Sequence, residues 1–349
     1  MKSIHLLGIL ILSICFLTAC GNKNGQTPSA DMGKDSLSMV KEIALRNEVS
    51  SRALKDRIAD FKLLCSIQKK GKYNIHILNG DGTNLQQITD DKGNDLLPKW
   101  LPDATGFVFE SDRNGKPHTY FFSLEDSLYK QVSRFDFKER SPSASKDNEI
   151  LFTSDKDKAQ HIYRMDRNGD NLQKLTATTY NDAYPVWSPD ALSFAFHSFR
   201  HDNQSEIFVA DRSGSNLVRI TDNNALDFTP DWSPDGKELV FVSNRTGNYD
   251  IFRVKANGEG EPVNITNTPD INEMMPTWSP DGAYIAYVAS TLNESHVYVM
   301  TADGAVSARI TPNNMVATMP NWRPPTEMEK AMDADKPSTT QKVEVRIGD

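Results

Sequence analysis

Short runs of apolar and aromatic residues recur along most of the chain, and polar turn residues separate them. Typical runs are "ELVFVS" at 238–243 and "DIFRV" at 250–254. Both are rich in β-branched and aromatic residues, which favour β-strands over helices. The segments between such runs contain Gly, Pro, Asp and Ser, as in "SPDG" at 233–236, and these residues favour tight turns. The pattern therefore predicts a succession of short strands joined by turns.

These runs are organised as a repeat. Its anchor is a tryptophan with a proline two residues before it, and one degenerate copy has alanine at the anchor position. The anchors are Trp100, Ala144, Trp187, Trp232, Trp278 and Trp322. Each unit ends in an aliphatic residue followed by Thr or Ser, as in Ile88-Thr89 and Ile220-Thr221. Two independent markers that occur six times, 43 to 46 residues apart, indicate the blades of a β-propeller.

The two ends of the repeat region complement each other. Residues 319–322 look like a first strand with no further strands after it, and residues 61–89 look like three strands without a first one. Joining them gives one composite blade. The strand edges of the two incomplete units are then paired with each other and cannot pair with another chain, which would lead to aggregation. The sequence thus predicts an all-β fold, a six-bladed β-propeller closed by a composite blade, with a short N-terminal helix.

The phrase Pro-x-Trp-Ser-Pro-Asp-Gly, together with the Ile-Thr ending, resembles the PD40 repeats of TolB-like six-bladed propellers over residues 61–324. The resemblance implies the propeller fold and a role in protein binding, since the TolB propeller receives the peptidoglycan-associated lipoprotein. TolB also has an α/β domain before its propeller and is soluble. Here only about 40 residues separate Cys20 from the first strand. We therefore do not transfer that partner to this chain.

The N-terminal segment resembles a bacterial lipoprotein signal. Lys2 precedes an apolar run at 4–16, and "LTAC" then ends at Cys20. We predict that residues 1–19 are removed as a signal peptide and that Cys20 carries the lipid, which would anchor the chain to a membrane. A plain secretory signal with an incidental cysteine is the alternative.

The segments that flank the propeller differ from it in composition. Residues 20–35 are polar and are predicted to form a tether, whereas 36–60 have the apolar spacing of a helix. This helix is expected to lie against the propeller, with partner binding as the alternative. Residues 325–349 are predicted to form a charged C-terminal tail, with an added short strand at 342–347 as one option.

The charge and cysteine content exclude several classes of protein. The formal net charge is −8, with 47 acidic and 39 basic residues, so there is no basic surface of the kind that binds nucleic acid. Three cysteines do not make a disulfide framework, and Cys65 is expected to be a small buried residue in a strand. The chain is expected to be a monomer without a cofactor.

The main candidate for a binding site is a set of acidic residues five positions before the anchors. Five of the six positions are acidic and the sixth is Ala317. The acidic residues are Asp95, Glu139, Asp182, Asp227 and Glu273. Because the position directly precedes the innermost strand, these side chains are predicted to surround one mouth of a central channel and to attract Lys or Arg side chains of a partner. The alternative is a structural role within each blade.

Other polar positions are assigned structural roles. Asn74, His118, His161, Glu206, Asp250 and His296 begin the third strand of each blade. The histidines lie in different blades, too far apart to share a metal ion. Asp190, Asp235 and Asp281 are predicted to form turns.

We expect a non-enzymatic scaffold that binds an envelope protein or peptide. It would be lipid-anchored in the bacterial cell envelope, at the outer membrane, facing the periplasm or the cell surface. The alternative is a propeller enzyme that acts on oligosaccharides with a metal near the axis. His201, with Gln204 nearby, is one pair that would suit it, and no catalytic residues or metal ligands are assigned.

Overall fold

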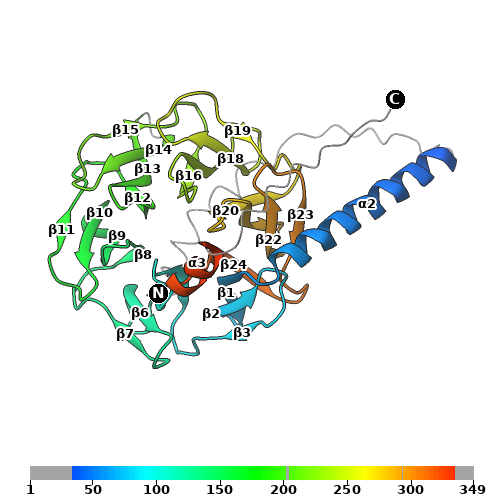
Figure 1. The fold of residues 1–349 in the computed structure, drawn as a ribbon. Helices are drawn as coiled ribbons and strands as arrows, with labels where there is room; N and C mark the ends of the chain where they lie inside the picture. The colour runs from blue at the N-terminus through cyan, green and yellow to red at the C-terminus, as the bar shows by residue number, and fades with distance from the viewer. Residues whose placement is uncertain (1–33, 202–203, 293, 335–349) are drawn as a thin grey trace. The chain divides into compact units, whose positions relative to one another are not determined.

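A computed structural model describes residues 34–201, 204–292 and 294–334. The chain divides into two compact units, residues 1–46 and 47–349. The described part of the first unit is the beginning of helix α2 (Lys34–Ile58). The second unit contains six four-stranded antiparallel sheets arranged in a ring (Figure 1). The all-β, six-bladed prediction is confirmed.

Each sheet is one blade, and we number the blades in the order of their innermost strands around the ring. Blade 1 is composite, as predicted, and consists of β24 (Val316–Trp322), β1 (Lys62–Lys69), β2 (Lys72–Asn79) and β3 (Gln86–Gln87). Blade 2 consists of β4 (Asp95–Trp100), β5 (Gly106–Ser111), β6 (His118–Ser123) and β7 (Tyr129–Gln131). Blade 3 consists of β8 (Arg140–Ala144), β9 (Glu149–Asp157), β10 (Ala159–Asp166) and β11 (Gln173–Lys174).

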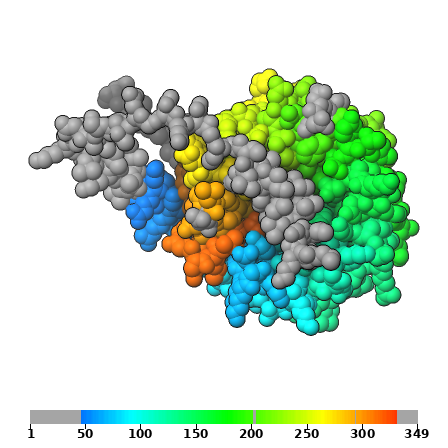
Figure 2. Space-filling model, turned by 180° about the vertical axis from the view of Figure 1, so that it is seen from behind, coloured from blue at the N-terminus to red at the C-terminus, as the bar shows by residue number. Residues whose placement is uncertain are grey.

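The remaining three blades are also continuous in sequence. Blade 4 consists of β12 (Asp182–Trp187), β13 (Ser193–His201), β14 (Gln204–Asp211) and β15 (Val218–Arg219). Blade 5 consists of β16 (Asp227–Trp232), β17 (Glu238–Ser243), β18 (Asp250–Lys255) and β19 (Val263–Asn264). Blade 6 consists of β20 (Asn272–Trp278), β21 (Tyr284–Ser290), β22 (Ser295–Thr301) and β23 (Ser307–Arg309). From behind, the first strands lie beside the last ones where the ring closes (Figure 2).

The hydrophobic core lies between neighbouring blades rather than in one central mass. The tryptophan anchors are 4 to 9% exposed. Trp232 of blade 5, for example, packs in one cluster with Ile207 of blade 4 and Phe241 of its own blade. Each anchor thus helps to attach its blade to the preceding one, because the apolar faces of two sheets are buried together.

The Ile-Thr marker has a local structural explanation. In five blades the threonine hydroxyl accepts a hydrogen bond from a backbone N–H of the third strand, at 2.9 to 3.0 Å. One such pair is Thr221 with the Ile207 N–H. The hydroxyl therefore satisfies a buried backbone donor beside the short outermost strand.

The Ser-Pro-Asp turns form as predicted. In blade 5 the Ser233 hydroxyl donates to Asp235, and the same carboxylate accepts the Lys237 N–H. Gly236 at the end of this turn has φ of 71°, and Ala191 takes the same left-handed conformation, with φ of 60°, in blade 4. The alanine copy therefore keeps the turn in a conformation that glycine adopts more easily.

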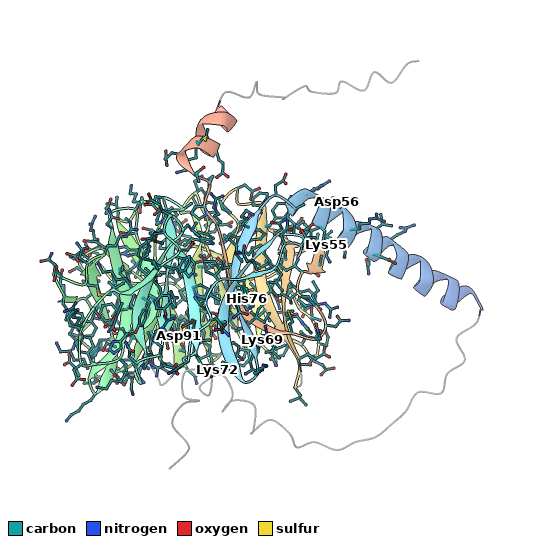
Figure 3. The ribbon with its side chains drawn as sticks, turned by 90° about the horizontal axis from the view of Figure 1, so that it is seen from below. Lys55, Asp56, Lys69, Lys72, His76 and Asp91 are labelled. Atoms are coloured by element: carbon teal, nitrogen blue, oxygen red, sulfur yellow. The ribbon has the colours of Figure 1, made fainter. Side chains whose placement is uncertain are left out.

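In the part of the chain that the structure describes, two helices flank the propeller sequence. Helix α2 is shifted by two residues from the predicted 36–60, and Leu54 and Ile58 in its last turns are buried in the core cluster of Trp322. In the side view, Lys55 and Asp56 lie on the face opposite Lys69 and Lys72 (Figure 3).

The predicted C-terminal tail begins with a helix, α3 (Glu327–Ala334), which the sequence analysis missed. Its signal was the capping box Thr326-x-x-Glu329, in which both residues bond to each other's backbone N–H. The sequence analysis predicted a tail from the charged composition of the segment, and the helix is only eight residues long, so the capping box alone was a weak signal.

Several predictions fall on segments that the structure does not describe. Cys20, the predicted signal peptide, nearly all of the predicted tether and the added strand at 342–347 lie outside the described residues. Cys65 is fully buried, and burial raises the pKa of its thiol to about 12, as expected for an inert structural cysteine. In the described ranges, neither helix is long and apolar enough to span a membrane.

Candidate functional site

The innermost strand of every blade is kinked at the same position. The residue three positions before each anchor has φ between 46° and 57° and precedes the repeated proline. These residues are Leu97, Ser141, Tyr184, Thr229, Met275 and Met319, and we call them the axial ring. Non-glycine residues rarely adopt this left-handed conformation. In all six blades the strand register also shifts at this point, which is the mark of a β-bulge.

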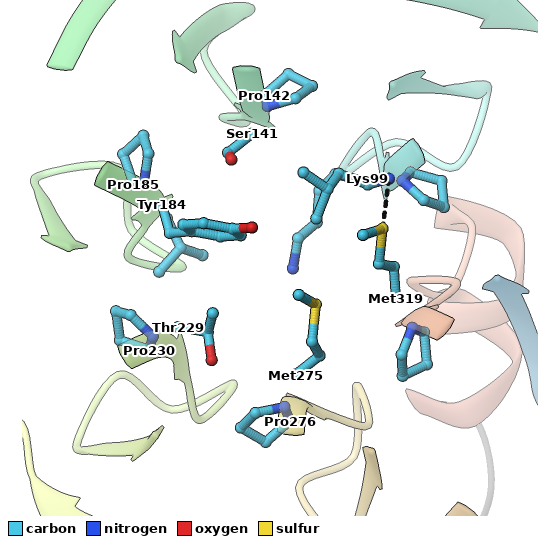
Figure 4. Close-up of a pocket in the computed structure, with 14 residues that line it drawn as sticks. Lys99, Ser141, Pro142, Tyr184, Pro185, Thr229, Pro230, Met275, Pro276 and Met319 are labelled. Atoms are coloured by element: carbon cyan, nitrogen blue, oxygen red, sulfur yellow. Dashed lines mark hydrogen bonds between the residues drawn. The ribbon is translucent and has the colours of Figure 1, made fainter. Parts of the chain in front are cut away.

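The axial ring lines a cavity at the centre of the propeller. Figure 4 shows Tyr184, Met275 and Lys99 pointing toward its centre, whereas the Met319 sulfur accepts a hydrogen bond from the Leu97 N–H at 3.2 Å. Water-sized molecules can occupy about 50 Å³ of it, which is room for a few waters. Methionine side chains adapt their shape readily to a bound surface. The ring therefore offers a mainly apolar, adaptable surface at the axis.

One charged side chain enters this cavity. Lys99 is the only charged residue among the fourteen that line it, and its Nζ lies 3.6 Å from Asp231. Lys99 belongs to blade 2 and Asp231 to blade 5, so the ion pair spans the axis between opposite blades. The side chains are 27% and 12% exposed, and Asp231 also accepts the Trp278 N–H at 3.0 Å. A long, partly exposed pair of this kind contributes little stability, so the ammonium can exchange its partner at low cost.

The predicted acidic ring is buried. Asp95, Glu139, Asp182, Asp227 and Glu273 are 0 to 2% exposed. In blades 2, 4 and 5 the aspartate forms an ion pair with an arginine at 2.8 to 3.0 Å. In each case the arginine lies two residues after a serine of the second strand. The pairs are Asp95–Arg113, Asp182–Arg200 and Asp227–Arg245.

The two longer acids of this ring have other surroundings. Glu139 accepts hydrogen bonds from Ser133 and the Thr119 N–H and lies 3.3 Å from His118. Burial and the neighbouring Asp250 raise the pKa of Glu273 to about 8. This placement agrees with the structural alternative for the five acids, and their direct contact with a partner stays a prediction.

The second polar set lies against the first one. His118 at the start of the third strand of blade 2 contacts Glu139 of blade 3. Glu206 of blade 4 and Asp227 of blade 5 share the Asn223 amide as a hydrogen-bond donor. The sequence analysis treated these sets as separate rings, whereas in these blades they form one buried polar layer between neighbours. Burial raises the pKa of Glu206 despite its contacts with Thr221 and Arg219.

Neither set forms a metal site in the described ranges, where no group of three or more His, Cys, Asp or Glu residues is placed to hold an ion. His201 and Gln204 face each other in the register of β13 and β14. They are not among the residues that line the axial cavity.

The sequence analysis missed the axial ring and Lys99. The proline two residues before each anchor was the available signal, because proline is excluded from the middle of a regular sheet and marks a bulge. The cavity is lined by these prolines, by the residue before each of them and, in blades 2 and 4, by the residue after it.

The fold and the axial cavity define a six-bladed β-propeller built as a rigid ring around a small central site. The chain belongs to the TolB propeller family. The family profile described as "TolB beta propeller domain" matches residues 59–190 and 182–274, which together make up more than half of the chain.

Individual relatives match over shorter segments. A TolB homologue of Chlorobium chlorochromatii is 29% identical over 134 residues, which cover 38% of this chain and 30% of that protein. A Tol-Pal system protein TolB of Anaeromyxobacter dehalogenans is 25% identical over 118 residues, 34% of this chain and 27% of the relative. This chain thus matches only 27 to 30% of the length of these relatives.

Solved structures support the fold. TolB from Acinetobacter baumannii aligns with a TM-score of 0.69 at 22% identity, covering 80% of this chain and 72% of that one. An oligogalacturonate lyase from Vibrio parahaemolyticus aligns with a TM-score of 0.52 at 16% identity, covering 72% and 75%. At these identities the alignments show that the propeller fold is shared, and a shared fold does not imply a shared activity.

Proposed function

We propose that this protein is a binding scaffold of the bacterial cell envelope, and that its axial ring docks an apolar segment of another envelope protein. The observation that carries the proposal is the composition of the ring, in which Tyr, Met, Leu and Pro side chains converge on the axis. Tyrosine and methionine are enriched in the buried cores of protein interfaces. Relatives named as Tol-Pal system proteins support an envelope partner.

The size and charge of the cavity limit what enters it. With room for only a few waters, the cavity accepts the tip of one or two side chains rather than a folded element. Lys99 would pair with an anionic group on that tip, such as a carboxylate, in exchange for its long contact with Asp231. The proposed partner therefore presents an apolar tip with one acidic group.

Membrane attachment is the second part of the proposal. It rests on the sequence of residues 1–20, in which Cys20 would carry the lipid after removal of residues 1–19. A lipid-anchored propeller would act on partners within reach of the membrane.

In-cell photo-crosslinking tests the docking site. A photoreactive phenylalanine analogue replaces Tyr184 in the axial ring, and Leu217, 41% exposed in blade 4, receives the same analogue as the control. We expect one envelope protein to crosslink at residue 184 and not at residue 217. Equal crosslinking at both positions, or none at residue 184, would contradict docking at the axis.

A catalytic role has no specific support in the site. The residues that line the axial cavity include no His, Cys, Asp or Glu, which are the side chains that hold catalytic metals or move protons. The proposal is therefore limited to binding.

A further inference from the structure

Three blades hold an arginine, 5 to 24% exposed, in the same kind of seat. In blade 5 the seat consists of Asp227, Ser243 and an aromatic pair, and it receives Arg245. The guanidinium binds Asp227 at 3.0 Å and the Ser243 hydroxyl at 2.8 Å. Its central carbon lies 4.6 Å from the centre of the Phe252 ring, within the range of a cation–π contact.

The same seat occurs in blades 2 and 4. Arg113 and Arg200 bind the aspartate five residues before the anchor and stack on an aromatic pair from the second and third strands. The ring centres of these pairs lie 5.7 to 5.9 Å apart at interplanar angles of 27 to 32° in all three blades. In each of these blades the guanidinium group therefore binds the same combination, a carboxylate together with two neighbouring aromatic rings.

Blade 6 has the carboxylate and the aromatic pair of this seat, without its arginine and with Ala289 in place of its serine. Glu273 pairs in register with Ala289, as Asp227 pairs with Ser243 in blade 5. The Tyr287 and Tyr298 rings lie 5.7 Å apart at 31°, which matches the other aromatic pairs. The position that corresponds to Arg245 is Thr291. The carboxylate and the aromatic pair are thus present, whereas the cation is missing from the chain at this point.

The carboxylate of this seat lacks a counter-charge in the described part of the chain. Glu273 is 2% exposed, and its Oε2 has no hydrogen-bond partner there. Its neighbours are the hydroxyl groups of Thr266 and Thr268 and another carboxylate, Asp250, which accepts hydrogen bonds from Asn248 and Asn264. A buried carboxylate beside a second one is strongly favoured to bind a cation or a proton.

The route by which arginine enters the seat begins at the surface. In blade 5 the arginine reaches inward from the hairpin between β17 and β18, and its side chain stays 24% exposed. In blade 6 the corresponding hairpin carries Thr291 and Leu292, which are exposed, Leu292 by 88%. The residues at the place from which Arg245 enters its own seat are thus exposed to solvent in blade 6.

We propose that the seat of Glu273, Tyr287 and Tyr298 in blade 6 binds the guanidinium group of an arginine side chain supplied by another polypeptide. The three filled seats identify the ligand, because they show which group this geometry holds. The seat lies between the first three strands of blade 6 and the preceding blade, and it shares no residue with the axial cavity. The inference is therefore independent of the proposed docking at the axial ring.

The test uses Nα-acetyl-L-argininamide as the probe and the full mature chain with ¹³C-labelled tyrosine. We expect saturable shifts of the Tyr287 and Tyr298 resonances in NMR spectra. Glu273→Gln should weaken binding at least tenfold, and Thr291→Arg should abolish it by filling the seat from within. Binding should strengthen from pH 6 to pH 8, because the guanidinium pairs with ionised Glu273, which faces Asp250 and Tyr287.

Three controls make the result decisive. Nα-acetyl-L-lysinamide carries the same charge without the planar fork and should bind more weakly. Calcium chloride tests whether the two carboxylates hold a metal ion instead. Unfolding of Thr291→Arg by urea shows that this variant folds. The proposal is overturned if the arginine probe gives no saturable shift, if Glu273→Gln or Thr291→Arg binds it unchanged, or if the lysine probe or calcium binds equally well.

Discussion

Replacing Glu273 by glutamine should remove a large part of the pH dependence of stability. Burial and the neighbouring Asp250 raise the pKa of Glu273 from 4.5 to about 8 in the folded protein. Its carboxyl group is therefore protonated in the folded state over a range in which it ionises in the unfolded chain. Glutamine has the same shape as the protonated form and does not titrate, so the substitution isolates this one proton.

The sign and size of the effect follow from this shift. Below about pH 4.5 the group is protonated in both states, and its contribution to stability is fully present. As the pH rises toward 8, the unfolded chain releases a proton that the folded protein retains, so stability falls by about 1.4 kcal/mol per pH unit. Between pH 5 and pH 7 the wild type should lose on the order of 3 kcal/mol relative to Glu273→Gln.

Urea unfolding followed by tryptophan fluorescence measures this difference, because the five tryptophans are anchors buried in five of the six blades. Wild type and variant are compared from pH 5 to pH 8, and Glu139→Gln serves as the matched control at the equivalent position of blade 3. A gap between wild type and Glu273→Gln that stays constant within about 0.5 kcal/mol over this range would refute the reasoning.

Three further predictions concern the other sites. Asp227→Asn should lower the free energy of unfolding by about 3 kcal/mol, because it leaves the Arg245 guanidinium without its counter-charge, and urea unfolding should show no such loss for the exposed Asp222→Asn. Lys99→Met should change stability by less than about 1 kcal/mol but reduce the Tyr184 crosslink, and an unchanged crosslink would remove Lys99 from the docking site. Cys20→Ser should abolish the acyl mass increment in mass spectrometry and release the protein from the membrane fraction, and retention there would contradict lipid attachment at this residue.

The fold could be predicted from the sequence because its signals are local and repeated. The anchor tryptophan, the Ser-Pro-Asp turn and the Ile-Thr ending each describe a few consecutive residues, and six copies compensate for degenerate ones such as Ala144. The composite blade followed from the same pattern, since β24 and β1 come from incomplete units at opposite ends of the repeat region.

The site was harder to predict because a bulge changes which side chains face the axis. In a regular strand, residues five, three and one positions before the anchor would lie on one face, so the acids would share the axis with Tyr184 and Lys99. The left-handed residue before the proline breaks this alternation. The acids consequently turn into the layer between blades, where Asp227 meets an arginine 18 residues further along the chain.

In a repeat protein, comparing the blades helps to distinguish residues with a structural role from residues with a functional one. A residue type that recurs in every blade, such as the proline before the anchor, needs an explanation that holds for every blade, and that explanation is structural. The six blades share one backbone pattern, so recognition of one partner in one orientation requires side chains that differ between blades. Lys99 is such a position, because the other blades have serine, valine, aspartate, threonine or asparagine directly before the anchor. Thr291 is another, because three other blades have arginine there. The departures from the repeat, rather than the repeat itself, are therefore where binding should be sought.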